Sequence, residues 1–157
     1  MMHVIRLRGP WELEVVARFV VREDGAYEAV KDDLPPGGRA TMPADWSDTI
    51  GPDFYGRVRY VRTFNKPTGL DSGERVFLVV EAPRSEACVM WKKELLGFVH
   101  AGEPPGRFEI TDRLEDHNRI EIFVDHPSLD CMRSKVGDPT KLPPGGLVGD
   151  VRLEIED

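Results

Sequence analysis

Two polar side chains able to hydrogen-bond a ligand, Asp125 and His126, stand at the end of a strongly alternating segment, RIEIFVDHP. Ile122 and Val124 fall on one face of the strand that this alternation predicts, and Asp125 falls on the other. Pro127 ends the strand because it has no backbone N–H for a neighbouring strand. The carboxylate is therefore expected at the rim of the domain, where it either contacts a ligand or caps backbone N–H groups of the following loop.

Two long connecting segments, residues 32–56 and 127–146, carry further side chains of the types that bind sugars. Trp46 and Tyr55 lie in the first segment, and Arg133 lies in the second. An aromatic ring packs on the apolar C–H face of a sugar, while carboxylates and guanidinium groups hydrogen-bond to its hydroxyls. The candidate sugar-binding residues are therefore Asp125, His126, Trp46, Tyr55 and Arg133. The alternative for Trp46 and Tyr55 is that both rings close the end of the core.

Metal-binding and catalytic patterns are weak. His117, His126 and Cys131 lack a recognised zinc spacing, so ordinary surface residues are the favoured interpretation. The acidic turns at residues 23–25, 32–33 and 114–116 suit a structural calcium ion, with solvated turns as the alternative. Cys88 and Cys131 are either two separate thiols or a disulfide pair. No nucleophile elbow, phosphate loop or dinucleotide fingerprint occurs, so no cofactor and no catalytic residue are predicted.

Composition narrows the class of protein. The chain has 157 residues, 31% of them charged, and a net charge of −7, which suits one ordinary globular domain. An acidic chain without a basic stretch disfavours nucleic-acid binding. No apolar run approaches the ~20 residues of a membrane-spanning helix, and no signal peptide is visible at the start. The compartment is left open, with a soluble cytoplasmic protein as the default expectation.

Alternating hydrophobic residues predict the strands that must position these side chains. In WELEVVARFVV, residues 11–21, every second residue from Trp11 to Val21 is apolar, whereas a helix would need a period of 3.6. Residues 56–64, 119–125 and 149–157 alternate in the same way. Residues 75–80 are continuously apolar, as expected for a strand covered on both faces.

Shorter strands are expected at residues 86–91, 95–100 and 107–111, with a single helical turn at 111–114. These elements predict an all-β fold, an antiparallel β-sandwich that occupies residues 1–157 as a single domain. The expected core contains Trp11, Leu13, Val15, Phe77, Val79, Ile120, Ile122 and Val124.

Seven phrases of the sequence occur in the order in which a known family has them: LRGPWEL, MPADW, GRVRYVRTFNKP, RVFLVVEAPRSEACVMWKKELLGFVHAG, RFEITDRL, NRIEIFVDHP and GGLVGDVRLE. Together they resemble the amino-terminal sugar-binding domain of family 2 glycoside hydrolases, the group of β-galactosidases, β-glucuronidases and β-mannosidases. The likeness covers about residues 7–154. It implies a galactose-binding-like jelly-roll sandwich, which matches the fold expected from the alternation.

The resemblance also implies what the chain does. In the family, the catalytic carboxylates lie on a separate barrel that has no counterpart in this sequence, so a non-catalytic domain is implied. In some β-galactosidases an aspartate just after the matching strand reaches the substrate pocket, and Asp125 occupies that position. Members usually carry Asn-Gly where this chain has Lys92 and Lys93, so a hairpin turn other than type I′ is expected. Several aromatic rim positions of the family are also missing.

One leading hypothesis for the function and two alternatives follow. The leading hypothesis is a stand-alone, non-catalytic carbohydrate-binding module for a β-galactoside-like or related glycan. The alternatives are a domain that kept the fold but binds a protein partner or a second copy of itself, and an accessory subunit or fragment of a glycosidase. A Trp or Tyr that faces solvent in a rim cleft would favour sugar, whereas a broad apolar face would favour a protein partner.

Overall fold

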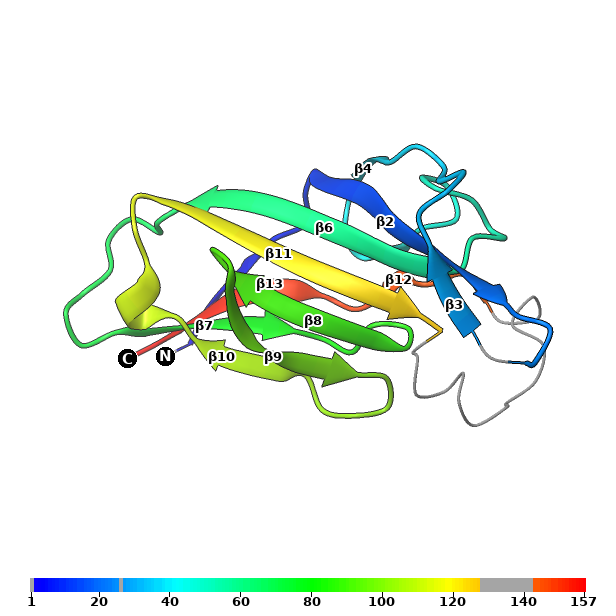
Figure 1. Cartoon of the computed structure of the whole chain (residues 1–157). Coiled ribbons are helices and arrows are strands. Elements are labelled where there is room, and N and C mark those ends of the chain that lie inside the picture. The colour runs from blue at the N-terminus through cyan, green and yellow to red at the C-terminus, as the bar shows by residue number, and fades with distance from the viewer. Residues whose placement is uncertain (1, 26, 128–142) are drawn as a thin grey trace.

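The alternating segments form two antiparallel sheets that pack face to face, as Figure 1 shows in a computed structural model. The structure describes residues 2–25, 27–127 and 143–157. The smaller sheet has the strand order β1-β13-β7-β10. The larger sheet has the order β3-β2-β6-β11-β8-β9, with β4 also paired to β2. The prediction of an antiparallel β-sandwich is confirmed.

The strands and the one short helix have the following bounds: β1 His3–Arg6, β2 Trp11–Val21, β3 Tyr27–Val30, β4 Gly38–Ala40, β5 Ala44–Asp45, β6 Gly56–Asn65, β7 Arg75–Val80, β8 Glu86–Trp91, β9 Glu94–His100, β10 Gly106–Glu109, η1 Thr111–Arg113, β11 His117–His126, β12 Gly146–Leu147 and β13 Val151–Glu156.

The core between the sheets is built from the inward faces of the long strands. Along β11, the residues at even positions from Asn118 to His126 are buried, while those between them are half-buried or exposed. The same alternation places Trp11 and Leu13 of β2 inside. All eight predicted core residues are buried, with exposures between 0% and 8%. Six of the eight lie in the core between the sheets, whereas Phe77 and Val79 are buried on the outer face of the smaller sheet, and Val76, Leu78 and Val80 are the β7 residues that face the core.

Strand β7 is buried on both faces, as its continuous apolar run predicts, but the second cover is made of charged side chains. Phe77 points away from the sandwich core, and the guanidinium carbon of Arg107 lies 3.5 Å from its ring centroid. Arginine can cover an apolar ring in this way because its stem and guanidinium plane pack on hydrocarbon while the charge stays in contact with water.

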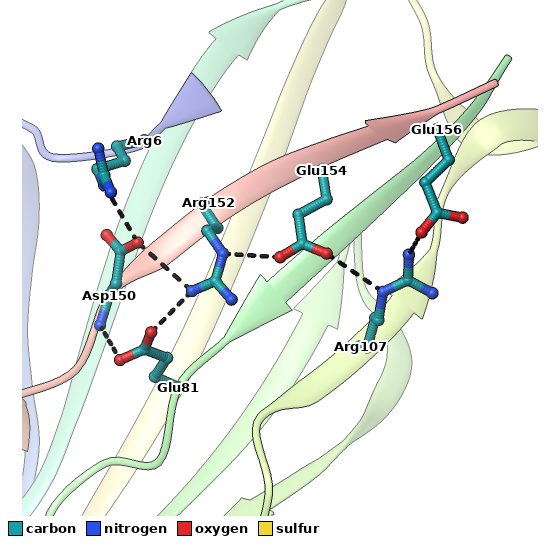
Figure 2. Close-up of polar contacts among 7 residues, drawn as sticks. All are labelled: Arg6, Glu81, Arg107, Asp150, Arg152, Glu154 and Glu156. Atoms are coloured by element: carbon teal, nitrogen blue, oxygen red, sulfur yellow. Dashed lines mark hydrogen bonds and ion pairs between the residues drawn. The ribbon is translucent and has the colours of Figure 1, made fainter. Parts of the chain in front are cut away.

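The charged cover continues across β13 as a ladder of alternating signs (Figure 2). At its centre, Arg152 donates to Glu81 (Nη1–Oε1, 2.8 Å) and to Glu154 (Nε–Oε2, 2.8 Å). Burial alone would raise the pKa of Glu154, but hydrogen bonds from Arg152 and Arg107 outweigh it and hold the pKa below 4.5. Each charge on this face thus already has a partner within the protein. The other members of the ladder are Arg6, Asp150 and Glu156.

Five short strands, β1, β3, β4, β5 and β12, escaped prediction because two to four residues are too few to display a period. The predicted helical turn is present at 111–113, and Leu114 packs against the core. The Thr111 hydroxyl accepts a hydrogen bond from the backbone N–H of Val76 on the neighbouring strand β7 (2.9 Å).

The hairpin between β8 and β9 contradicts its prediction. Lys92 has φ 44° and Lys93 has φ 75°, so both loop residues adopt the positive φ that a type I′ turn requires. The prediction of a different turn assumed that lysine would avoid this region. The two-residue connection and the twist of the paired strands determine the type of turn. Both lysines are therefore held in a strained backbone conformation with positive φ. Lys92 also forms an ion pair with Glu115.

We therefore expect the Lys92→Asn/Lys93→Gly variant to gain about 1–2 kcal/mol in free energy of unfolding, since a left-handed conformation costs a lysine about that much. Urea denaturation measures the gain. Lys93→Gly alone keeps the ion pair to Glu115 and serves as the matched control. Loss of stability in both variants would show that the turn is not strained.

Within the residues that the structure describes, no helix is long and apolar enough to cross a membrane.

Candidate functional site at the sandwich rim

The rim is the end of the sandwich where β11 finishes at His126 and β6 begins at Gly56. Three of the five predicted sugar-binding residues meet here. The His126 ring centroid lies 6.1 Å from that of Trp46 and 6.1 Å from that of Tyr55. Asp125 is adjacent in sequence but points to the opposite face of β11, as the alternation predicts. Arg133 lies outside the described residues.

Trp46 is a core residue. Its side chain has 0% exposure and packs edge-on against Phe54, whose backbone carbonyl accepts a hydrogen bond from the indole N–H (3.2 Å). Gly145 closes over the ring so tightly that a Cβ atom there would lie 2.6 Å from the indole. The hypothesis that Trp46 is a platform for a sugar is therefore wrong, because the ring's faces are already occupied by protein.

The loop around Trp46 is ordered by its own polar groups. The Asp45 carboxylate accepts hydrogen bonds from the hydroxyl (2.5 Å) and backbone N–H (2.9 Å) of Ser47, and the Ser47 hydroxyl is the main cause of its lowered pKa. The backbone N–H of Trp46 donates to the carbonyl of Gly145 (2.9 Å). Pairing of β5 with β12 adds further bonds, so the two long connecting segments hold each other at the rim.

His126 is a second structural residue of the rim, with 3% exposure. Its Nε2 lies 2.7 Å from the carbonyl oxygen of Pro143, which can only accept a hydrogen bond, so Nε2 carries the proton. In the neutral ring, Nδ1 then accepts from the Ser85 hydroxyl at 2.5 Å. Ser85 is held at φ 95°, a strained value for a residue with a side chain. The imidazole joins the start of β8 to the segment that follows residue 142.

We predict that this imidazole makes the protein sensitive to mild acid. Burial is the main cause that lowers the pKa of His126 from 6.5, and the positive charge of Arg84 lowers it further. The unfolded chain takes up a proton near pH 6.5 and the folded chain resists it, so stability is fully present above about pH 6.5 and is lost as the pH falls below it. His126→Gln should remove this part of the decline in melting temperature between pH 7 and pH 5.5.

The exposed His117 on the same strand provides the control, since His117→Gln should leave the decline as it is in the unmodified chain. Carboxylates with lowered pKa values, such as Glu109 and Glu154, lose their contribution only below about pH 4.5 and do not interfere. A decline that is identical in His126→Gln would contradict the prediction.

Asp125 has a partner that sequence analysis missed. The carboxylate receives two hydrogen bonds from Arg57 of β6, Nε to Oδ1 at 2.6 Å and Nη2 to Oδ2 at 2.9 Å. The Asp125 side chain is only 14% exposed, and its hydrogen bond raises the pKa of Arg57. This paired geometry is the stronger class of charged hydrogen bond. The carboxylate therefore does not stand free at the rim.

We expect Asp125→Ala to lower the free energy of unfolding by about 1–3 kcal/mol, because it leaves a partly buried guanidinium without its partner. Glu109→Ala is the matched control, since Glu109 makes the same two-pronged contact with Arg75 on an exposed surface. That variant should lose clearly less stability than Asp125→Ala, because solvent screens the exposed pair. Both losses are read from urea denaturation. An unchanged stability in Asp125→Ala, together with loss of saccharide binding, would instead make Asp125 a sugar contact.

The zinc alternative is excluded for His117 and His126 as a pair. His117 and His126 occupy opposite ends of β11, about 30 Å apart at ~3.3 Å per residue, and cannot share an ion. Cys131 lies outside the described residues. Within the described part of the chain, no three His, Cys, Asp or Glu side chains gather closely enough to hold a metal ion.

Register explains why Arg57 and Ser85 were missed. Sequence alternation places Arg57 on the outward face, but only the pairing of Asp125 with Arg57 across β11 and β6 brings the two together. Ser85 precedes β8 and has no periodic signal of its own. A rule that pairs outward charges of opposite sign at strand ends would have suggested the first contact and not the second.

Comparison with solved structures identifies the architecture. The chain aligns with an FMN-binding β-glucuronidase from Faecalibacterium prausnitzii L2-6 at 26% identity and a TM-score of 0.68, covering 99% of this chain and 22% of that one. It aligns with a Bifidobacterium dentium β-glucuronidase complexed with coumarin-3-O-glucuronide at 21% identity and a TM-score of 0.70, covering 98% and 30%. A candidate β-galactosidase from Bacteroides fragilis gives 22% identity and a TM-score of 0.64, covering 98% and 23%.

The chain therefore spans less than a third of the length of these glycosidases, and nearly all of it has the fold of one part of them. The resemblance to family 2 glycoside hydrolases that the sequence indicates is confirmed as a likeness of fold. No protein-family model matches the chain. No curated protein sequence matches it either.

Proposed function

We propose that this domain is a non-catalytic carbohydrate-binding module. The observation that carries the proposal is the alignment of 98–99% of the chain with one part of glycosidases, one of them a complex with a glucuronide. The catalytic carboxylates of the family lie on a separate barrel, whereas this chain matches a β-sandwich part of these enzymes, so the likeness favours binding over catalysis. The expected ligand is a saccharide of the β-galactoside type or a related glycan.

Fewer of the predicted residues are available for sugar contacts than the sequence suggested. Asp125 and His126 are engaged within the protein, and Trp46 is buried. We retain two residues as proposed sugar contacts: Tyr55, which is half-buried beside His126, and Arg133, which lies outside the described residues. A phenol ring that is only partly covered can still offer its edge to a ligand.

A glycan-array screen followed by calorimetry on each hit tests the proposal. The expected result is saturable binding of at least one saccharide, with no turnover of aryl β-galactosides, β-glucuronides or β-mannosides above buffer. Tyr55→Ala should weaken that binding, while Tyr60→Phe, a change in the buried core, should not. Turnover that survives repurification and disappears on mutating one carboxylate would overturn the non-catalytic part.

An apolar surface favours a second function, protein–protein association. Leu95 and Phe98 of edge strand β9 are each 53% exposed on the outward face of the larger sheet. Their cross-strand neighbours are Met90 and Cys88 of β8, and Phe123 of β11 continues the row. No tryptophan faces solvent, since all three are buried, and by exposure alone this face suits a polypeptide partner better than a sugar.

The partner that this row fits most directly is a second copy of the chain, since like apolar patches complement each other about a twofold axis. Analytical ultracentrifugation measures the association. Leu95→Ser/Phe98→Ser should abolish any dimer and leave saccharide binding intact. A protein that is monomeric at high concentration before mutation would remove this second function.

A further inference from the structure

The apolar side chains on the outward face of the larger sheet form a patch on the neighbouring strands β11, β8 and β9 (Figure 1). Phe123, Cys88 and Phe98 pair across the strands in one row, and Met90 and Leu95 pair in the next row. The odd-numbered residues of β8 are buried in the core, so Cys88 and Met90 face outward. These five residues, which we call the apolar patch, are therefore continuous across three strands.

A β-bulge brings both exposed residues of β9 to this face. Leu95 and Phe98 are three positions apart, so in a regular strand they would face opposite sides of the sheet. The register between β8 and β9 shifts at this point and leaves Leu96 as the extra residue, which packs against the core. Leu95 and Phe98 consequently both face outward, each 53% exposed.

The face of β9 is better suited to a partner than its edge. Gly97 lies so close to β10 of the smaller sheet that a Cβ atom there would be 2.7 Å from the ring of Phe108. The bulge at Leu96 also breaks the regular spacing of backbone N–H and C=O groups that an added strand would need. A partner is therefore expected to pack against the apolar patch and not to extend the sheet.

The charges that flank the apolar patch reverse in sign from one end to the other. Glu86 begins β8 at the rim end, beside Asp125 of β11, and Lys92 follows β8 at the hairpin end. Arg119 of β11 also lies at the hairpin end, next to the pair of Ile120 and Trp91. All four charged side chains have interactions within the chain, so across an interface they would set orientation more than affinity.

A second copy of the chain matches this pattern when the stacked strands are antiparallel. A twofold axis between the two faces, crossing β8 at right angles between Cys88 and Met90, places Phe98 opposite Leu95 of the partner subunit. The same axis places the acidic end of each patch opposite the basic end of the other. Parallel stacking would instead set like charges against each other, which is unfavourable.

We propose that two copies of the chain pack through the apolar patch, face to face and with their strands antiparallel. This inference rests on the proposed protein–protein association and specifies its partner and its orientation.

Cross-linking with a short bismaleimide tests the orientation on the full chain, with Cys88→Ser/Cys131→Ser as the background. His100→Cys and Lys93→Cys each add one thiol, at the rim end and the hairpin end of β9, and leave the four flanking charges in place. Stacked sheets lie ~10 Å apart and strands rise ~3.3 Å per residue, so in antiparallel stacking two copies of the same variant hold their thiols more than about 20 Å apart.

We expect a mixture of the two variants to give a cross-linked dimer and either variant alone to give none. Leu95→Ser/Phe98→Ser should remove the cross-link. Cross-linking of one variant alone, or a dimer in ultracentrifugation that none of the samples cross-links, overturns the antiparallel packing and leaves association standing. A dimer that survives Leu95→Ser/Phe98→Ser overturns the role of the apolar patch. A chain that is monomeric at high concentration overturns both proposals and leaves the patch to a different protein.

Discussion

Trp46→Ala is expected to lower the free energy of unfolding by about 3–5 kcal/mol, the range for removal of a large aromatic side chain from a packed core. The indole has 0% exposure, and it contacts Phe54, His126 and Gly145, which belong to three separate segments. Its removal therefore opens a cavity that the rim cannot close by moving one loop. Urea denaturation followed by circular dichroism measures the loss.

Trp46→Phe is the matched control, since it keeps a ring in the core and gives up only the hydrogen bond to the Phe54 carbonyl and part of the contact area. It should cost clearly less than the alanine variant. Saccharide binding should persist in Trp46→Phe. A variant at Trp46 that keeps its stability and loses saccharide binding would restore the residue as a sugar platform.

Ile122→Ala is expected to cost about 2–5 kcal/mol. Ile122 has 0% exposure at the centre of β11, between Tyr60 of β6 and Val89 of β8, so no neighbouring chain end can move into the space. The adjacent Glu121 points to the outward face and pairs with Arg119, which makes Glu121→Ala the matched control. That variant should lose at most about 1 kcal/mol. A loss below half a kcal/mol in Ile122→Ala would refute the placement of the core.

The sequence was most informative where side chains alternate over long strands. In β2, β6, β11 and β13 the period of two determines which face meets the core, and most of the burial follows from it; Val61 and Glu154 are buried at outward positions. The run at β7 was also predictable, because only a strand covered on both faces can be apolar throughout. These strands are sufficient to specify two antiparallel sheets that enclose one core.

Contacts that depend on register could not be predicted in the same way. The bond from Arg57 to Asp125 joins residues 68 positions apart and exists because β6 and β11 pair in one particular register. Burial of Trp46 depends on two loops meeting over it, which no local pattern encodes.

The lysine hairpin illustrates a different limit. The preference of lysine for negative φ predicted a turn other than type I′ at Lys92 and Lys93. The strands on either side, however, leave only two loop residues, and both adopt positive φ. Tertiary geometry therefore overrode a local preference of about 1–2 kcal/mol per residue.

Saccharide binding is the central claim, and titration of the isotope-labelled chain with saccharides, followed by amide NMR, tests it most directly. We predict saturable shift changes confined to a few residues. They should include residues near Tyr55 at the rim. Absence of saturable changes for neutral and acidic saccharides alike, up to about 10 mM where even weak millimolar binding would be visible, would contradict the account.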